Sequence, residues 1–126
     1  MNRLIKRRAS QENIPIKLVV VGDGTVGKTS LLLAYMKNQY YEDHEPTLFD
    51  TMTKEVTIPS LPNVTILLTA EDTAGQEGLE HLRPFSYTDA DVILLCFSVE
   101  NRDSFENIQD IWLTEVSKSS LSSFFF

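Results

Sequence analysis

The residues best suited to chemistry in this sequence form a glycine-rich loop, Gly22–Thr29, which reads G-D-G-T-V-G-K-T after an apolar run at 16–21. This is the G-x-x-x-x-G-K-[ST] pattern of a phosphate-binding loop between a strand and a helix. Its glycines let backbone N–H groups form an anion nest, and the helix directs its positive N-terminal end at the same phosphates. Lys28 adds a charge for the β- and γ-phosphates, and the Thr29 hydroxyl is placed to bind Mg²⁺. The loop predicts a nucleoside triphosphate site; the alternative is a glycine-rich turn that caps an ordinary helix.

A second candidate segment, Asp72–Glu77, reads D-T-A-G-Q-E and follows an apolar run. Ligands bind at such strand ends in open α/β sheets, and a carboxylate there can hold Mg²⁺ through water. Gly75 offers a backbone N–H to a γ-phosphate, and Gln76 is suited to orienting an attacking water. The alternative is an acidic turn that starts a helix.

A third candidate, Thr47, lies in the polar loop 38–47. Pro46 stiffens this loop, and Thr47 could close over Mg²⁺ and the γ-phosphate through its hydroxyl and N–H. The polarity and length of the loop indicate a segment that a ligand orders. An ordinary loop-to-strand junction would look similar, so the alternative stays open at this position.

The elements that must position these loops follow from the hydrophobic pattern. We expect strands at 16–22, 53–58, 64–69 and 92–97, a first helix from inside the phosphate loop to residue 37, and another helix from residue 103. The strands at 53–58 and 64–69 read as a hairpin around a turn at 59–63. The apolar run 92–97 is typical of a strand covered on both faces.

The last predicted helix has its own start signal. Asp103–Glu106 resembles a capping box. The apolar side of this helix carries Phe105, Ile108, Ile111, Trp112 and Val116. The alternation of strands and helices predicts an α/β fold with a mainly parallel sheet between two helical layers.

Composition limits the classes of protein that fit. The 126 residues suffice for one domain, and 42% are hydrophobic. Five basic residues stand against one acidic residue in 1–17, whereas the net charge of the chain is −7, and this acidic body argues against binding nucleic acid. The lone Cys96 excludes an internal disulfide and suits core packing in a reducing, cytoplasmic setting. We expect a disordered basic arm at 1–15, one domain at 16–116 and a Ser/Phe-rich tail at 117–126.

Together, the motifs in 16–116 make the chain resemble the Rho family of small GTPases within the Ras superfamily. The matching segments are K-L-V-V-V-G-D-G-T-V-G-K-T-S-L-L, P-T-L-F-D, D-T-A-G-Q-E and L-R-P-F-S-Y. The run L-L-C-F-S-V, the later S-F-E-N-I and Trp112 resemble the Rho branch in particular. The resemblance implies a P-loop three-layer sandwich with strand order 2-3-1-4-5-6, of which this chain would hold about four strands and three helices.

The resemblance also implies a GTP/GDP switch with Mg²⁺. Gly24 would face the γ-phosphate, Gln76 would position the hydrolytic water, and Tyr40 would pack against the base and ribose. The implied catalytic residues are Gln76, Lys28 and Thr47, and the implied Mg²⁺ ligands are Thr29, Thr47 and Asp72. The implied nucleotide contacts are Gly22, Asp23, Gly24, Thr25, Val26, Gly27, Lys28, Thr29, Ser30, Tyr40, Thr47, Asp72, Ala74, Gly75 and Gln76. The implied partners are exchange factors, GTPase-activating proteins and effectors.

The sequence departs from the family in several places. His44 and Leu79 stand where the family typically has aromatic residues, which bears on contacts with effectors and regulators. No N/T-K-x-D or S-A-K element reads a guanine base, and no C-terminal Cys box for a lipid anchor follows Cys96. We therefore expect a truncated domain in which the base is poorly held and the strand at 92–97 is an open apolar edge. The alternative function is a fragment that turns over no nucleotide and is inert or sequesters regulators; an ATPase of another P-loop class is the remaining option.

Overall fold

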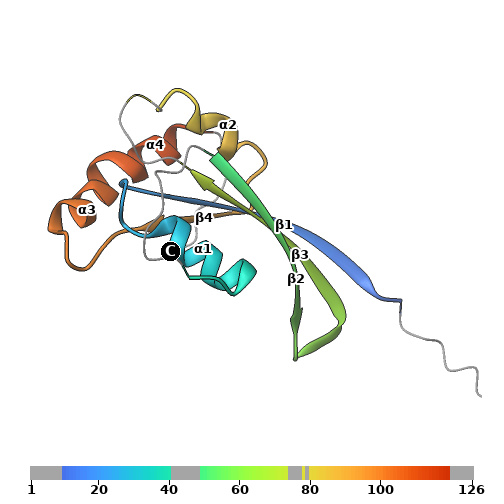
Figure 1. The fold of residues 1–126 in the computed structure, drawn as a ribbon. Coiled ribbons are helices and arrows are strands. Elements are labelled where there is room, and N and C mark those ends of the chain that lie inside the picture. The colour runs from blue at the N-terminus through green and yellow to red at the C-terminus, as the bar shows by residue number, and fades with distance from the viewer. Residues whose placement is uncertain (1–9, 41–48, 74–77, 79, 120–126) are drawn as a thin grey trace, which may run out of the picture.

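A computed structural model gives the fold and describes residues 10–40, 49–73, 78 and 80–119. Its centre is a four-stranded sheet with the order β2-β3-β1-β4 (Figure 1). The strands are β1 (Glu12–Gly22), β2 (Phe49–Ile58), β3 (Leu61–Thr73) and β4 (Val92–Cys96). β1 runs parallel to both β3 and β4, whereas β2 pairs with β3 in antiparallel register. The mainly parallel α/β fold and the order 2-3-1-4 predicted from the sequence are confirmed.

Three helical segments in the described part of the chain cover this sheet. They are α1 (Lys28–Lys37), α2 (Arg83–Tyr87), and a continuous segment of α3 (Arg102–Asn107), the π-helical turn η1 (Ile108–Trp112) and α4 (Leu113–Lys118). In Figure 1, α1 lies on one side of the sheet, and α2 lies with the α3–α4 segment on the other. No helix among the described residues combines the length and the apolar character needed to cross a membrane.

The buried side chains of the described residues form two core clusters, one on each face of the sheet. Consecutive residues of a strand point to opposite faces, so β1, buried along its last residues, contributes to both clusters. One cluster packs Val19, Val21, Tyr87, Trp112 and Val116, and the other packs Val20, Leu32, Met36, Met52 and Ala70. This is the three-layer arrangement that the alternation of strands and helices predicts.

Several element boundaries differ from the sequence-based expectation. β1 begins at Glu12 rather than at residue 16, because residues 12–15 pair with residues 64–67 of β3. β2 begins earlier than expected, β3 is longer at both ends, and the turn of their hairpin is reduced to Pro59 and Ser60. The pattern of single strands underestimates these lengths because pairing partners extend a strand beyond its apolar residues.

The last helical segment starts and packs differently from the prediction. Its N-cap is Asn101, whose side chain accepts a hydrogen bond from the Ser104 N–H, rather than the predicted Asp103. Trp112 and Val116 are buried as predicted, but Phe105 is 57% exposed and Ile111 also faces solvent. The π-helical turn explains this mismatch, because it shifts the side-chain phase of a regular helix.

The apolar run of β4 predicted a strand covered on both faces, but β4 is not covered in this way. Val92 and Leu94 are 48% and 39% exposed, and β4 pairs only with β1 among the described residues. Cys96, at the end of β4, is half-buried and packs against the cluster around Val20. The apolar edge expected at this strand is therefore present in the described part of the chain.

Candidate phosphate and metal site

The phosphate-binding loop lies between β1 and α1, as its sequence predicts. Gly27 is the N-cap of α1 with a positive φ of 99°, and its carbonyl accepts the first helical hydrogen bond, from Leu31 N–H at 2.9 Å. Thr25 also has a positive φ, of 67°. Left-handed residues at alternate positions, 25 and 27, turn the loop back on itself and favour the concave arrangement of amides that binds anions.

Gly22 at the start of the loop has a steric role. A Cβ atom at this position would lie 2.2 Å from the Cys96 carbonyl oxygen of β4, and the φ of Gly22 is 152°. Glycine therefore allows the end of β1 to approach β4 without overlap. This close approach fixes where the chain leaves the sheet and enters the loop.

Replacing Gly22 by alanine should destabilise the protein more than the same change at Gly27. Both positions have positive φ, a strain worth about 1–3 kcal/mol with a side chain. In Gly22→Ala alone, the new Cβ atom would also overlap the Cys96 carbonyl oxygen, which should increase the loss of stability by about 1–3 kcal/mol. Urea unfolding of both variants measures the difference, and equal losses of stability would contradict this role of Gly22.

Lys28 is the buried cation of the site. Its side chain curls back over the loop, and Nζ donates 2.8 Å hydrogen bonds to the carbonyl oxygens of Gly22 and Asp23. The residue is only 6% exposed, and this burial lowers its pKa below the usual 10.5, against the opposing attraction of the carboxylates of Asp72 and Asp23 and of Cys96. A charge held by two carbonyls in a concave loop is a preorganised partner for an anion.

Two of the predicted metal ligands meet at the carboxyl ends of β1 and β3. The Thr29 hydroxyl, in the first turn of α1, donates a 2.5 Å hydrogen bond to Oδ2 of Asp72. Asp72 is fully buried and pairs in register with Val20 of β1. The neighbouring Thr73 hydroxyl donates to the Val20 carbonyl at 2.7 Å, which fixes this strand end.

This hydroxyl and carboxylate suit a hard divalent cation. Mg²⁺ prefers oxygen ligands and usually takes one or two from the protein while keeping several waters. In the described part of the chain there is no group of three or more His, Cys, Asp or Glu side chains that could hold a metal. Among the described residues, the Thr29 and Asp72 oxygens are the ligands that a cation at this place would use, a number that Mg²⁺ tolerates.

The structure places only part of the predicted nucleotide-binding set. Gly22 to Ser30 and Asp72 lie together around the loop, and Tyr40 beyond α1 is 75% exposed. Thr47, Ala74, Gly75 and Gln76 lie outside the described residues, so their predicted roles stay predictions.

Sequence patterns missed the partners of Asp23. Its carboxylate accepts hydrogen bonds from Asn107 Nδ2 and from Trp112 Nε1, both at 2.7 Å. Trp112 was expected only to pack in the core. The contacts join residues 84 and 89 positions apart, and no local spacing signals such pairs.

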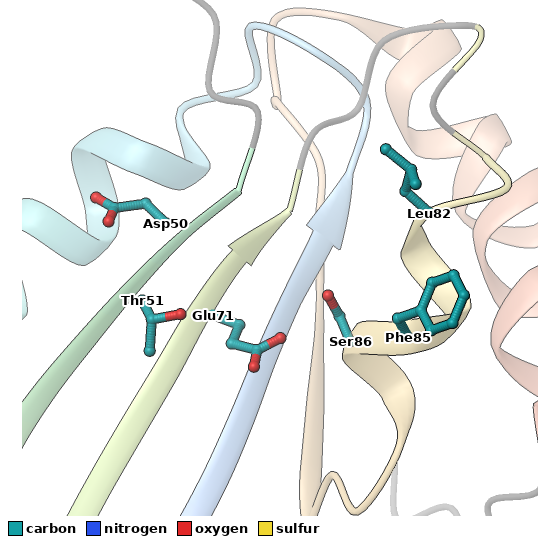
Figure 2. Close-up of a pocket in the computed structure, with 6 residues that line it drawn as sticks. All are labelled: Asp50, Thr51, Glu71, Leu82, Phe85 and Ser86. Atoms are coloured by element: carbon teal, nitrogen blue, oxygen red, sulfur yellow. The ribbon is translucent and has the colours of Figure 1, made fainter.

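The described residues line pockets beside the sheet, and two of these lie near α2 and the phosphate loop. One of about 310 Å³ lies between the sheet and α2 and is lined by Asp50, Thr51, Glu71, Leu82, Phe85 and Ser86 (Figure 2). The other, of about 380 Å³, lies between the start of α1 and β4 and is lined by Val26, Gly27, Lys28, Leu31, Leu94, Leu95, Cys96 and Phe97. The second pocket thus adjoins the phosphate loop, whereas the first lies against α2.

A glycine-rich loop between strand and helix, a buried lysine and a hydroxyl–carboxylate pair define a phosphate-binding α/β domain of the P-loop class. The family model described as "Ras family" matches residues 17–125. A "GTP-binding RHO-like protein" of Candida albicans is 47% identical over 105 residues, which is 83% of this chain and 30% of that protein. "GTP-binding protein RHO4" of Saccharomyces cerevisiae is 42% identical over 112 residues, and its namesake in Eremothecium gossypii is 45% identical over 101.

The chain belongs to the Ras family of small GTPases, and its similarity to Rho-like proteins places it in the Rho family, as its motifs predicted. The matches cover 89% and 80% of this chain for the two RHO4 proteins, but 38% of each of those proteins. The chain thus spans about a third of the length of these curated relatives.

Proposed function

We propose that this chain is a Rho-type molecular switch that binds guanine nucleotide with Mg²⁺ and hydrolyses GTP. The observation that best supports it is the placement of Lys28 and the Thr29–Asp72 pair around one phosphate loop. The names of these relatives, which describe them as GTP-binding proteins, support guanine as the base.

Each residue of the loop has a distinct part in this proposal. The loop amides and the Lys28 ammonium bind and orient the β- and γ-phosphates, with Gly24 facing the γ-phosphate and Tyr40 the base. Thr29, Asp72 and Thr47 would hold Mg²⁺, which supplies charge neutralisation for the phosphates when bound. Gln76 orients the attacking water, and the loops around Thr47 and Gly75 present the bound state to effectors and regulators.

The test measures the affinity of the 126-residue chain for fluorescent GDP, GTP and ATP, with and without Mg²⁺, followed by phosphate release. Binding of both guanine nucleotides that Mg²⁺ strengthens, together with release of phosphate from GTP, is the expected result. Equal affinity for ATP and GTP, or no binding, would overturn the proposal. Binding without phosphate release would favour the alternative of a chain that engages regulators without turnover.

Replacing Thr29 by alanine should remove most of the gain in affinity that Mg²⁺ brings. Thr29→Ala removes the hydroxyl but leaves Asp72, and Thr29→Ser restores the hydroxyl. A lost ligand oxygen should cost about tenfold in the Mg²⁺-dependent part of the affinity, or about 1.4 kcal/mol. Titrations of fluorescent GDP at several Mg²⁺ concentrations measure it; an unchanged Mg²⁺ response in Thr29→Ala would place the cation elsewhere.

A further inference from the structure

The carboxylate of Asp23 ties the phosphate loop to the helical segment on one face of the sheet. It accepts one hydrogen bond on each oxygen, from Asn107 Nδ2 on Oδ2 and from Trp112 Nε1 on Oδ1. The carbonyl of the same residue accepts from Lys28 Nζ at 2.8 Å. One loop residue therefore links the helical segment to the buried cation of the phosphate site.

The π-helical turn η1 makes this double contact possible. Asn107 and Trp112 are five residues apart, and in a regular α-helix such residues point about 140° away from each other. In a π-helix, hydrogen bonds run from i to i+5, as Leu113 N–H to the Ile108 carbonyl does here, and residues five apart lie on one side. Such turns are rare and occur frequently at functional sites. The irregularity brings both donors to one carboxylate.

The other side of Trp112 faces α2. The Arg83 guanidinium carbon lies 4.6 Å from the centre of the Trp112 ring, and Arg83 is 2% exposed. Arg83 also forms two-pronged hydrogen bonds of 2.8–3.0 Å with the Glu115 carboxylate, which accepts a further hydrogen bond from the Tyr87 hydroxyl. A continuous line of partly or fully buried contacts thus runs from Asp23 in the loop to both ends of α2.

We propose that Trp112 and Asn107 are positioning residues that couple the phosphate loop to α2. Their side chains donate to the Asp23 carboxylate, and the Asp23 carbonyl accepts a hydrogen bond from Lys28. The Trp112 ring also packs against the Arg83 guanidinium. The state of the loop and the packing of α2 then depend on each other through Asp23, Trp112 and Arg83. The nucleotide-dependent part of this inference rests on the proposed function; the coupling in the ligand-free protein does not.

Amide hydrogen exchange of the ligand-free chain tests the coupling directly. Trp112→Phe keeps an aromatic ring next to Arg83 but removes the indole N–H. It should speed exchange about tenfold at 22–28 and at 83–87, as the loss of one hydrogen bond to a charged group predicts. Asn107→Leu should do the same at 22–28. The matched control is Val116→Ala, which opens the same core cluster without touching Asp23.

A purely structural role makes a different prediction. If Trp112 only fills the core, Trp112→Phe and Val116→Ala should speed exchange in the same segments by similar factors, and that result would overturn the proposal. Exchange that is faster at 22–28 and 83–87 in Trp112→Phe alone supports it. Both variants are compared well below their unfolding temperatures, so that global opening does not set the rates.

A nucleotide experiment extends the test by thermodynamic reciprocity. GDP with Mg²⁺ should slow exchange at 83–87 in the natural chain, and this protection should disappear in Trp112→Phe, whose GDP affinity should fall about tenfold. Protection retained in Trp112→Phe would overturn the route through Trp112. If equilibrium dialysis detects no GDP binding to the natural chain, the proposed function fails, and the ligand-free comparison still decides this inference.

Discussion

Replacing Lys28 by methionine should weaken the binding of guanine nucleotide about a hundredfold or more. Methionine keeps the apolar stem but removes the ammonium that bonds the Gly22 and Asp23 carbonyls. Hydrogen bonds to charged groups contribute about 1.5–3 kcal/mol each, and the ammonium can serve two phosphates. The loss of about 3 kcal/mol corresponds to the hundredfold change. Fluorescent GDP titration measures it.

The matched control for this variant is Lys54→Met. Lys54 also donates a 2.8 Å hydrogen bond to a backbone carbonyl, that of Tyr35, but it lies on β2 and outside the phosphate loop. Its replacement should leave affinity within about twofold, because it removes an equal charge at a place that touches no phosphate. Similar losses in both variants would mean that overall charge, rather than Lys28 itself, determines binding.

A pH series gives a second readout of Lys28. Burial lowers its pKa below 10.5 in the ligand-free protein, and phosphate requires the protonated ammonium. Affinity should therefore decline as the pH rises through this lowered value, before free lysine would lose its proton. Lys28→Met should lack this alkaline decline.

Replacing Arg83 by methionine should cost about 3–5 kcal/mol of unfolding free energy. Arg83 is almost fully buried, and its removal leaves the Glu115 carboxylate without its guanidinium partner beside the Tyr87 hydroxyl. Breaking a buried ion pair from one side is costly because the remaining charge stays desolvated. The Trp112 ring also loses its cation contact. Urea unfolding followed by circular dichroism measures the change.

The helical segment supplies a matched control for this pair. Arg102 and Glu106 form an ion pair of the same 2.8 Å length, but their side chains are 88% and 51% exposed. Arg102→Met should change stability by no more than about 0.5 kcal/mol, because exposed pairs contribute little. The double variant Arg83→Met/Glu115→Leu should recover part of the loss, since no buried charge then remains. A cost for Arg83→Met as small as that for Arg102→Met would contradict this account.

The phosphate loop shows how much of the site the local sequence pattern can predict. Glycines, lysine and threonine at fixed spacing after an apolar strand were enough to predict the loop and its helix. These features follow from backbone freedom and helix geometry, which depend on neighbours in the sequence. The mainly parallel sheet was predictable because few topologies accommodate such an alternation of strands and helices, whereas its strand order came from the resemblance to the Rho family.

The local sequence pattern was less successful at predicting features that depend on tertiary packing. The apolar run of β4 predicted burial on both faces, yet Val92 and Leu94 are exposed, because hydrophobicity says how well a strand can be buried and not what covers it. Phe105 and Ile111 follow a helical spacing that the π-helical turn breaks. Asn101 rather than Asp103 caps that segment, a shift of two residues that is common where several polar residues precede a helix.

The sequence by itself determined the class of site: a phosphate loop on a mainly parallel α/β sheet, with a hydroxyl at the start of the following helix and a carboxylate at a strand end. Only the tertiary structure determined which distant side chains contact and support that loop. The donors to Asp23 and the Arg83–Glu115 pair join residues 32 to 89 positions apart. Such contacts depend on how the helical segment crosses the sheet and on one irregular turn within it. Spacing rules describe neighbours along the chain, whereas these hydrogen bonds exist because folding brings distant side chains to one buried place.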